Sequence, residues 1–508
     1  MAQPFRVILI WPLAATLAGC VVGPNFTAPT PDTPTAWSAS VSPVTADQAS
    51  RVTAQATAAG AWWDAFNDPE LTSLVKRAAA ANLDAKQAVL RIAEARAQRD
   101  AAASAGWPSL GVNASDQVNR LSESTPTGAL FSKVGQFPGL GGVSIPNPYE
   151  QYQLGFDASW EIDLFGRVRR SVEAAKADAE ASVEDSRAVL ITTLGEVART
   201  YIDLRGAQAK RRIVADNIAT ERDLLDLAGQ RRQAGLSSHI DVVRAAAEAS
   251  AAEAQLPSLD QQITVDINAL SKLLALEPGA LRAELQAATP VPPPPPLVPI
   301  GLPADLARRR PDIREAEARL HAATARMGVA VGDLYPKLTL SAGGGYQSQS
   351  VSTLTNWASR FLNAGPNVDL PIFEGGRLRA NVRLQDAQAK EAALAYRAAV
   401  LSALHEVDNA LAAYGSDQVR LQSLSATVAR NREAVELARQ RYASGVGAFI
   451  DVLDAERSRQ QNALLLADGT AAISTDLVVL YKALGGGWEM EQAARGPAVG
   501  QSANLEAK

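Results

Sequence analysis

The second half of this chain repeats the first half at long range. The pattern Gln-Arg-(x)3-Gly-(x)4-Ile-Asp-Val-(x)2-Ala occupies residues 230–245 and returns at 440–455. A Gly-Arg-x-Arg sequence at 166–169 returns at 376–379, at the same offset of about 210 residues. Because both landmarks keep one spacing, the stretch between them has the same length in the two copies. The repeat therefore predicts two copies of one structural unit, with a rigid element between the landmarks.

The upstream part of the repeat has a different offset. Residues 83–84 and 107–110 correspond to 311–312 and 335–338, about 228 positions later. About 18 residues were therefore gained or lost between 108 and 166, which predicts that this segment carries a loop.

The first twenty residues have the pattern of an export signal. Arg6 is their only charged side chain, an apolar run follows from 7 to 17, and Leu-Ala-Gly-Cys closes it at 17–20. This ending resembles a bacterial lipobox, which makes residues 1–19 a signal peptide and Cys20 a lipidated N-terminus. The alternative is an ordinary signal with an incidental cysteine. Val21 replaces the Asp typical of lipoproteins kept at the inner membrane, and by the same resemblance this implies the outer membrane.

Two segments have the composition of linkers. Residues 20–60 are rich in Pro, Thr, Ser and Ala, which predicts a lipidated, extended tether. Residues 291–303 include five consecutive prolines and predict a polyproline-like connector. A net charge of -5 and a pI near 5.5 argue against a nucleic-acid partner. After the signal, no apolar run approaches the roughly 20 residues of a spanning helix, so a membrane crossing would need strands.

Period-two alternation predicts strands in both halves. The even positions from 152 to 164 are apolar and most odd positions are polar, which gives one apolar and one wet face. Shorter versions occur at 110–114, 338–342 and 362–372. A soluble sandwich produces the same alternation. However, two hairpins inside otherwise helical halves cannot close a sandwich core, which favours strands of a membrane barrel.

The remainder of each half has the composition of long helices. The stretches 166–235 and 376–445 each span roughly 69 residues without proline, or about 100 Å as a helix. Alanine-rich faces allow neighbouring helices to approach closely. A single polar helix of this length needs neighbours for stability. We therefore expect a coiled-coil wall. Further helices are expected over these ranges: 69–106, 239–276, 303–334 and 449–484.

Several short motifs then occur in a distinctive order. They are Leu-Ala-Gly-Cys with Val-Gly-Pro at 17–24, Arg-Arg-Pro-Asp-Ile-Arg-(x)2-Glu at 309–317, Asp-Leu-Tyr-Pro at 333–336, Phe-Glu-Gly-Gly-Arg at 373–377, Asp-Val-Leu-Asp at 451–454 and Leu-Tyr-Lys-Ala-Leu-Gly-Gly-Gly-Trp at 480–488. With them the chain resembles TolC-type outer-membrane efflux proteins. The lipobox and the Pro-rich connector resemble the lipoprotein branch, the NodT-like outer-membrane factors of resistance-nodulation-division (RND) pumps.

This resemblance implies a mainly α fold with a membrane β-barrel. Each subunit of a homotrimer would give four strands to a twelve-stranded barrel and long helices to a periplasmic α-barrel. Four strands leave two edges that lipid cannot satisfy, so closure by other copies is required independently. The implied organisation is a first repeat at 61–290, a second repeat at 304–488 and a tail at 489–508. Phe156, Trp160 and Ile162 would then face lipid, and Asp157 and Glu161 the lumen.

The resemblance also assigns a periplasmic gate. Asp451 and Asp454 lie three residues apart at the start of a returning helix, hence on one face. They match the paired aspartates that ring the closed mouth in the family, and Ile450 would add an apolar ring. The alternative is that these carboxylates only stabilise the positive end of the helix, by about 0.3 to 1 kcal/mol each. Both roles are compatible.

A latch and a docking surface follow from the same resemblance. Asp241 and Tyr442 match residues whose hydrogen bond holds helical hairpins shut, although an arginine of that latch is Gly447 here. Tyr442 is otherwise a packing residue. The hairpin tips would contact a periplasmic adaptor, and their glycines would also cap helices. The tip residues are Gly235, Leu236, Gly445 and Val446.

No pattern in the sequence indicates catalysis or metal binding. His239, His321 and His405 lack the spacing of metal ligands, and the single cysteine excludes a disulfide framework. No nucleophile motif or phosphate loop is present, so we expect no enzyme and no cofactor beyond the lipid on Cys20. The expected function is an outer-membrane exit duct for drugs or other small molecules, served by an adaptor and an inner-membrane RND pump. Two alternatives are a type I protein-secretion duct and a lipid-anchored coiled-coil scaffold without a pore.

Overall fold

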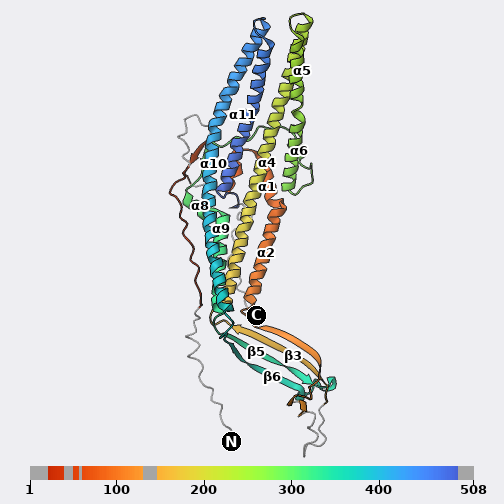
Figure 1. Ribbon diagram of the computed structural model, residues 1–508, viewed down its shortest axis with the longest axis vertical. Coiled ribbons are helices and arrows are strands. Elements are labelled where there is room, and N and C mark those ends of the chain that lie inside the picture. The colour runs from red at the N-terminus through yellow and green to blue at the C-terminus, as the bar shows by residue number, and fades with distance from the viewer. Residues whose placement is uncertain (1–20, 39–49, 56–59, 127, 130–145, 490–508) are drawn as a thin grey trace, which may run out of the picture. The chain divides into compact units, whose positions relative to one another are not determined.

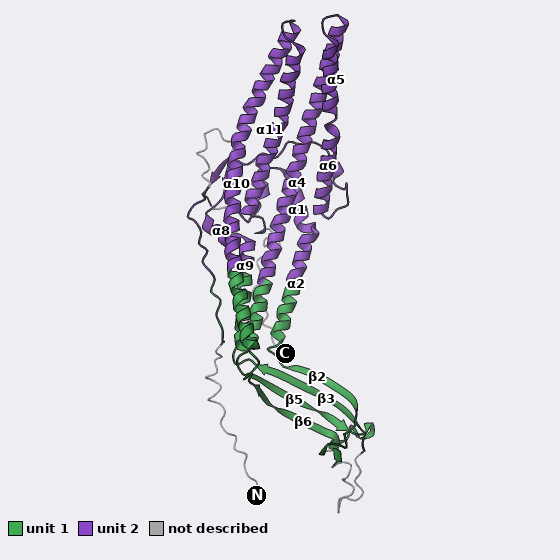
Figure 2. Cartoon of the chain, in the orientation of Figure 1, with its two compact units in different colours: residues 1–28, 94–179, 318–393 green, residues 29–93, 180–317, 394–508 purple. Residues whose placement is uncertain are grey.

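A computed structural model describes residues 21–38, 50–55, 60–126, 128–129 and 146–489. The predicted signal peptide, Cys20 and the tail from 490 lie outside these residues. The chain divides into two compact units, coloured in Figure 2. Unit 1 comprises residues 1–28, 94–179 and 318–393, and unit 2 comprises 29–93, 180–317 and 394–508. Each unit therefore combines segments from both repeats.

Unit 1 contains one four-stranded antiparallel sheet, labelled in Figures 1 and 2. Each half supplies a pair of strands, as the alternation predicted, in the spatial order β2-β3-β5-β6. The bounds are β2 Ser109–Asn119, β3 Tyr149–Ile162, β5 Lys337–Ser348 and β6 Arg360–Asp369. The last strand ends before the predicted Ile372, because Pro371 has no backbone N–H with which to continue the ladder.

Two helices of 67 residues are the longest elements. They are α4 Arg167–Gln233 and α10 Arg377–Ala443, as the repeat spacing predicted. Gly166 and Gly376 precede them with φ of +83° and +86°, a backbone conformation that favours glycine. The equal lengths confirm that the repeat describes one element of constant length in both halves.

Three of the remaining four helices expected from the sequence are each divided into two. The pairs are α1 Pro69–Ala81 with α2 Leu83–Ser104, α5 His239–Glu253 with α6 Leu256–Leu273, and α8 Pro303–Arg309 with α9 Pro311–Gly332. The fourth, α11 Phe449–Ala483, is continuous. Pro257 and Pro311 each occupy a first turn, where proline is tolerated because its missing N–H needs no partner. At Asn82 the side chain caps α2 by accepting from the Ala85 N–H at 3.0 Å.

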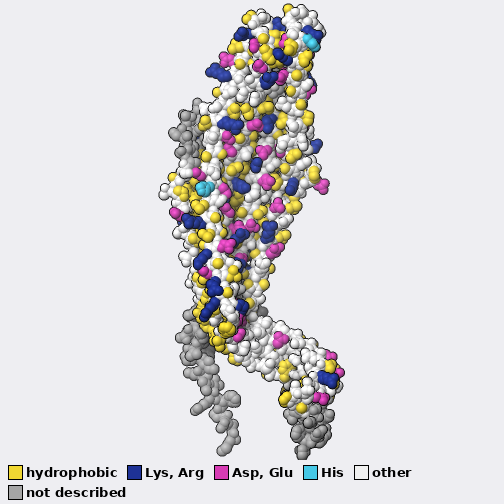
Figure 3. All heavy atoms as spheres, in the orientation of Figure 1, with side chains coloured by type: hydrophobic (Ala, Val, Ile, Leu, Met, Phe, Trp, Pro, Cys, Tyr) yellow, Lys and Arg dark blue, Asp and Glu magenta, His cyan; other side chains and the backbone are white. Residues whose placement is uncertain are grey.

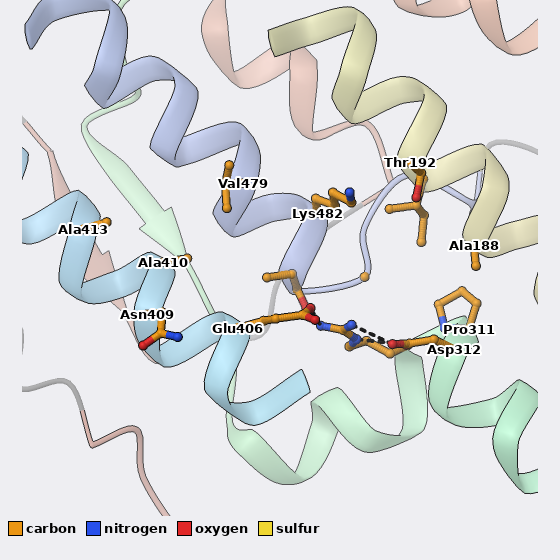
Figure 4. Close-up of a pocket in the computed structure, with 14 residues that line it drawn as sticks. Ala188, Thr192, Pro311, Asp312, Glu406, Asn409, Ala410, Ala413, Val479 and Lys482 are labelled. Atoms are coloured by element: carbon orange, nitrogen blue, oxygen red, sulfur yellow. Dashed lines mark hydrogen bonds and ion pairs between the residues drawn. The ribbon is translucent and has the colours of Figure 1, made fainter. Parts of the chain in front are cut away.

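Arg310, in the break between α8 and α9, connects three helices of unit 2. Its guanidinium donates to the Asp312 carboxylate at 2.6 and 2.9 Å and to the Ala483 carbonyl at 2.9 Å, and it pairs with Glu406 at 2.8 Å. Figure 4 shows these carboxylates beside a pocket of about 550 Å³ between α4, α10 and α11. Gly485 packs against Arg310 so closely that a Cβ there would lie 2.9 Å from Arg310 Cγ. The Arg-Pro-Asp motif thus has a structural role.

The linkers are more ordered than their composition predicted. Within the tether, β1 (Arg51–Thr53) pairs in parallel with β4 (Leu297–Pro299) of the Pro-rich connector. Trp37 Nε1 donates to the Gly301 carbonyl at 3.1 Å. Unsatisfied backbone groups beside a packed helix bundle are costly, and this pairing satisfies several of them.

The residues that follow Cys20 form a short strap, residues 21–26, on the helices of unit 1. The Val22 N–H donates to the Phe165 carbonyl at 3.1 Å, and the Phe26 ring stacks on His321 with centroids 4.4 Å apart. Gly23 crosses Gly328 so closely that a Cβ on Gly23 would lie 2.6 Å from Gly328 Cα. The start of the mature chain is therefore packed against the fold.

One described helix, α11, could cross a membrane by length and composition alone. An 18-residue window of this helix has a mean hydropathy of 1.6 with at most two charged side chains, so α11 comes closer to a spanning helix than the sequence predicted. The core helix of a bundle passes the same test. Buried Ile473, Leu477 and Tyr481 on α11 belong to the core of unit 2.

Candidate functional site

The sheet of unit 1 has two chemically different faces. Register places Phe156 beside Val112 and Gly344, and Asp157 beside Gly111 and Gly343. Residues that share a register position point to the same side, so the apolar even positions of β3 continue across the sheet. Apolar side chains on this face are largely exposed, with Val112 at 81% and Leu362 at 79%. Such an exposed patch needs a cover of lipid or protein.

The edges of this sheet are open. Within the described part of the chain, neither β2 nor β6 pairs with a further strand. Strands of 11 and 10 residues present many unpaired backbone groups, which is unusual in a stable soluble edge. Figure 3 shows charged side chains spread over the helices and few of them on the visible face of the sheet.

The tips of the two hairpins have matching turns. In α4–α5 the Leu236 N–H donates to the Arg231 carbonyl at 2.8 Å, and in α10–α11 the Val446 N–H donates to the Arg441 carbonyl at 3.0 Å. Gly235 and Gly445 adopt φ of +72° and +79°. The turns leave Leu236 and Val446 70% and 74% exposed. Their glycines cap helices as expected, and their apolar residues are available at the surface.

The predicted gate residues lie in the first turns of α11. An Asp451 oxygen accepts from the Ala448 N–H at 3.3 Å and so caps the helix, and Ile450 is half-buried. Asp454 is exposed and pairs with Arg457 at 3.1 Å. Arg457 also pairs with Glu248 of α5. The carboxylates therefore have local partners that a sequence alone does not reveal.

The predicted latch residues are not joined within one chain. Asp241 accepts from the Ser238 N–H at 3.3 Å and caps α5. Tyr442 is 8% exposed, and its buried hydroxyl has no hydrogen-bond partner. The Tyr442 ring packs on Phe449 with centroids 5.2 Å apart and lies beneath the Arg231 guanidinium. Gly447 is part of the turn, and its N–H donates to the Arg441 carbonyl at 3.0 Å.

A buried polar network that the sequence did not predict links the two hairpins. Glu456 of α11 is 1% exposed and accepts from both Arg439 and Arg459. Arg459 continues to Asn217 of α4 at 3.1 Å. Glu221 of α4 accepts from Gln460, and burial raises the pKa of this carboxyl. The available signal in the sequence was the group of charged residues between 454 and 459.

Two of the three histidines have side-chain partners within the described residues. His239 Nδ1 lies 2.6 Å from an Arg232 nitrogen, and His321 Nε2 lies 2.9 Å from a Glu173 oxygen. In the described ranges, no three His, Cys, Asp or Glu side chains converge as metal ligands.

The family model named "Outer membrane efflux protein" matches residues 74–276 and 302–486. The chain is 31% identical to "Nodulation protein T" of Rhizobium leguminosarum bv. trifolii over 93% of its length and 95% of that relative. It is 34% identical to "Solvent efflux pump outer membrane protein SrpC" of Pseudomonas putida over 84% of its length and 87% of that relative.

Solved structures agree with these sequence matches. The outer-membrane channel OprN superposes with a TM-score of 0.81 at 33% identity, over 92% of this chain and 100% of that one. The mainly α fold with membrane strands is thereby confirmed, and so are the outer-membrane location and the prediction that the protein is not an enzyme. With nearly its whole folded length matched, this chain belongs to the outer membrane efflux protein family.

Proposed function

We propose that this protein is the outer-membrane exit duct of a tripartite RND-type efflux system that exports drugs or other small molecules. The main observation that supports this proposal is a sheet with an exposed apolar face, a polar face and two open edges, in a chain with two long helical hairpins. The names of the relatives, which include a solvent efflux pump component, support the small-molecule cargo.

Closure of the sheet by other copies of the chain follows from what lipid can accept, and the family resemblance sets the number of copies at three. A hydrocarbon environment offers no partners to the backbone groups of β2 and β6, so these edges must pair with strands of other copies. Four strands per subunit then give a twelve-stranded barrel in a homotrimer. The apolar face, with Phe156, Trp160 and Ile162, would meet lipid. Asp157 and Glu161 would line the water-filled lumen.

The partners in this proposal are a periplasmic adaptor and an inner-membrane RND pump. The tip residues Gly235, Leu236, Gly445 and Val446 offer the adaptor two similar exposed turns. No energy-coupling motif occurs in the chain, so the duct is passive and opens when the adaptor and pump engage it. A lipid on Cys20 would anchor the strap in the membrane.

The gate in this proposal is a ring of Ile450, Asp451 and Asp454 from three subunits. The negative charge of Asp451 is partly offset by the positive end of the helix that it caps, and the negative charge of Asp454 is partly offset by Arg457. The proposed Asp241–Tyr442 latch can form only after rearrangement or between subunits, because within one chain Asp241 accepts from the Ser238 N–H and the Tyr442 hydroxyl has no hydrogen-bond partner.

Two measurements test the proposal. Purified protein in planar bilayers should form cation-selective channels, and a deletion strain should become sensitive to small toxic compounds until the gene is restored. If gate-neutralised protein forms no channel at all, the protein is a scaffold instead. If only a secreted protein accumulates in the deletion strain, the duct serves type I secretion.

A further inference from the structure

The polar face of the sheet carries a cluster of amide side chains near the start of β3. Strand register places Gln117 beside Gln151, and Gln153 beside Gln347. Because residues that share a register position point to the same side, these four side chains gather on the polar face. Gln349 comes directly after β5. We call these five glutamines the amide cluster.

The protein's own hydrogen bonds do not occupy the amide cluster. Within the described ranges, none of the five amides donates or accepts a side-chain hydrogen bond. A glutamine amide offers two donor hydrogens and one acceptor oxygen. Gln151, Gln347 and Gln349 border a groove of about 290 Å³. The groove therefore presents several hydrogen-bonding groups that are available to a ligand.

Two aromatic side chains flank the same groove. Tyr149 and Phe361 both border it, and in the described strands they are the only aromatic residues at register positions of the polar face. Phe361 stands beside Gly345, which pairs with Gly155. A Cβ on Gly155 would lie 3.2 Å from Phe361 Cζ, so the ring reaches across β5 to the backbone of β3. The glycines thus leave room for a flat apolar surface beside the amides.

The groove has little charge of its own. Asp116 and Glu150 alternate with the glutamines and so point to the other face of the sheet. Arg360 borders the groove, but its guanidinium lies over the Trp357 ring. A charged ligand would therefore lose hydration without meeting an opposite charge. Neutral ligands with several hydroxyl groups suit the groove better.

We propose that this groove binds a neutral saccharide at the outer mouth of the duct. The assignment rests on the proposed function, which makes the polar face the lumen wall and the start of β3 its outer end, because α4 follows the other end of β3. Sugar hydroxyls donate and accept hydrogen bonds, as amides do, and the C–H face of a sugar ring packs on an aromatic ring. A volume of about 290 Å³ is at the small end of ligand pockets and suits a short saccharide.

The test records ion current through the purified full-length channel in planar bilayers, with maltohexaose as the neutral saccharide probe. Maltohexaose should block the wild-type current, and polyethylene glycol of similar size should not, because its chain carries no hydroxyl groups between its ends. Gln347→Leu and Phe361→Ala should each weaken the block about fivefold, as expected for the loss of one neutral hydrogen bond or one ring contact.

Asn367→Leu is the matched control for the groove variants. It removes an amide from the same face at the other end of β6, beside Thr339, and should keep the wild-type block. A conducting wild-type channel that maltohexaose does not block overturns the proposal. Equal block by the two probes, or unchanged block in both groove variants, does the same.

The side of addition identifies the source of the saccharide. Block from the outer side alone assigns the site to a cell-surface saccharide. Block from the periplasmic side, in a channel whose gate is neutralised by Asp451→Ala and Asp454→Ala, assigns the site to a saccharide that passes through the duct.

A second measurement does not depend on conductance. A protein that forms no channel contradicts the proposed function, and the groove is then tested by saturation-transfer NMR in a detergent without sugar headgroups. Saturation of the protein's aromatic protons should reach the C–H protons of maltohexaose in the wild type and be lost in Phe361→Ala. No transfer in the wild type overturns the saccharide site.

Discussion

Arg231 lies over the ring of Tyr442, with its guanidinium carbon 4.3 Å from the ring centroid, and donates to the Tyr442 backbone carbonyl at 2.7 Å. Arg231 belongs to α4 and Tyr442 to α10, so this contact joins the two hairpins near their tips. The connection uses the face of the ring and the main chain. The tyrosine hydroxyl, which the family resemblance emphasised, does not take part within one chain.

The first prediction separates these two parts of Tyr442. Arg231→Ala removes a cation–π contact and a charged hydrogen bond, so the assembly should lose about 1 to 3 kcal/mol of stability and conduct more at rest. Tyr442→Phe removes only an unpaired hydroxyl and should change stability by less than about 1 kcal/mol. Chemical denaturation and single-channel recording measure both. A large rise in conductance in Tyr442→Phe would show instead that the hydroxyl forms the latch between subunits.

The second prediction concerns the gate carboxylates. Replacing Asp451 and Asp454 with Ala should lower cation selectivity and weaken block by multivalent cations, because a negative field in a narrow mouth is lost. Arg457→Ala should raise cation selectivity, since it leaves Asp454 and Glu248 without their cation. Reversal potentials in a salt gradient measure both effects.

The aspartate replacements should lower cation selectivity and the Arg457 replacement should raise it, so a general disturbance of the fold would not reproduce both results. If Asp451 serves only to stabilise the start of the helix, its replacement costs about 0.3 to 1 kcal/mol of stability and leaves the reversal potential unchanged. Unchanged selectivity in a folded double variant would remove both aspartates from the gate.

The third prediction concerns the anchor. Cys20→Ala should abolish labelling by radioactive palmitate and still allow insertion, because strands rather than acyl chains satisfy the membrane. The contacts of Val22 and Phe26 do not involve Cys20, so the strap should remain packed. Palmitate incorporation into the variant would disprove the lipobox interpretation. Protease protection of residues 21–26 reports on the strap.

The fourth prediction tests the role of Arg310. Gly485→Ala combines an unfavourable φ of +70° with a Cβ 2.9 Å from Arg310 Cγ. Gly279→Ala is the matched control, because its φ is +81° but no atom lies within 4 Å of the added Cβ. The control should cost about 1 to 2 kcal/mol from backbone strain alone. The Gly485 variant should cost about 1 to 3 kcal/mol more, and equal losses would show that Arg310 can move aside.

Period and spacing predicted most of the fold. The even positions of 152–164 identified β3, and the absence of proline between Gly166 and Gly235 identified α4, because both signals are local and repeated many times. The helix breaks were missed although Pro257 and Pro311 stand in the sequence. A proline is compatible both with a kink and with a new first turn, and only packing decides between them.

The helical positions of the candidate gate and latch residues were largely predictable from the sequence, but their side-chain partners were not. Asp241 and Asp451 lie in first helical turns as expected, whereas Asp454 lies in the next turn of α11. Two contacts show why: Arg231 lies over Tyr442, and Arg457 lies between Asp454 and Glu248. The contacts of Arg231 with Tyr442 and of Arg457 with Glu248 each join different helices and residues about 210 positions apart, and no local pattern encodes such a pairing.

The helices that return from the two hairpin tips differ in continuity. In the first hairpin the returning helix is interrupted, since α5 ends at Glu253 and α6 begins at Leu256. The second, α11, is an unbroken rod of 35 residues from Phe449 to Ala483, which ends beside Arg310. We therefore expect a force on the first tip to bend its returning segment at this interruption, and a force on the second tip to be transmitted along α11.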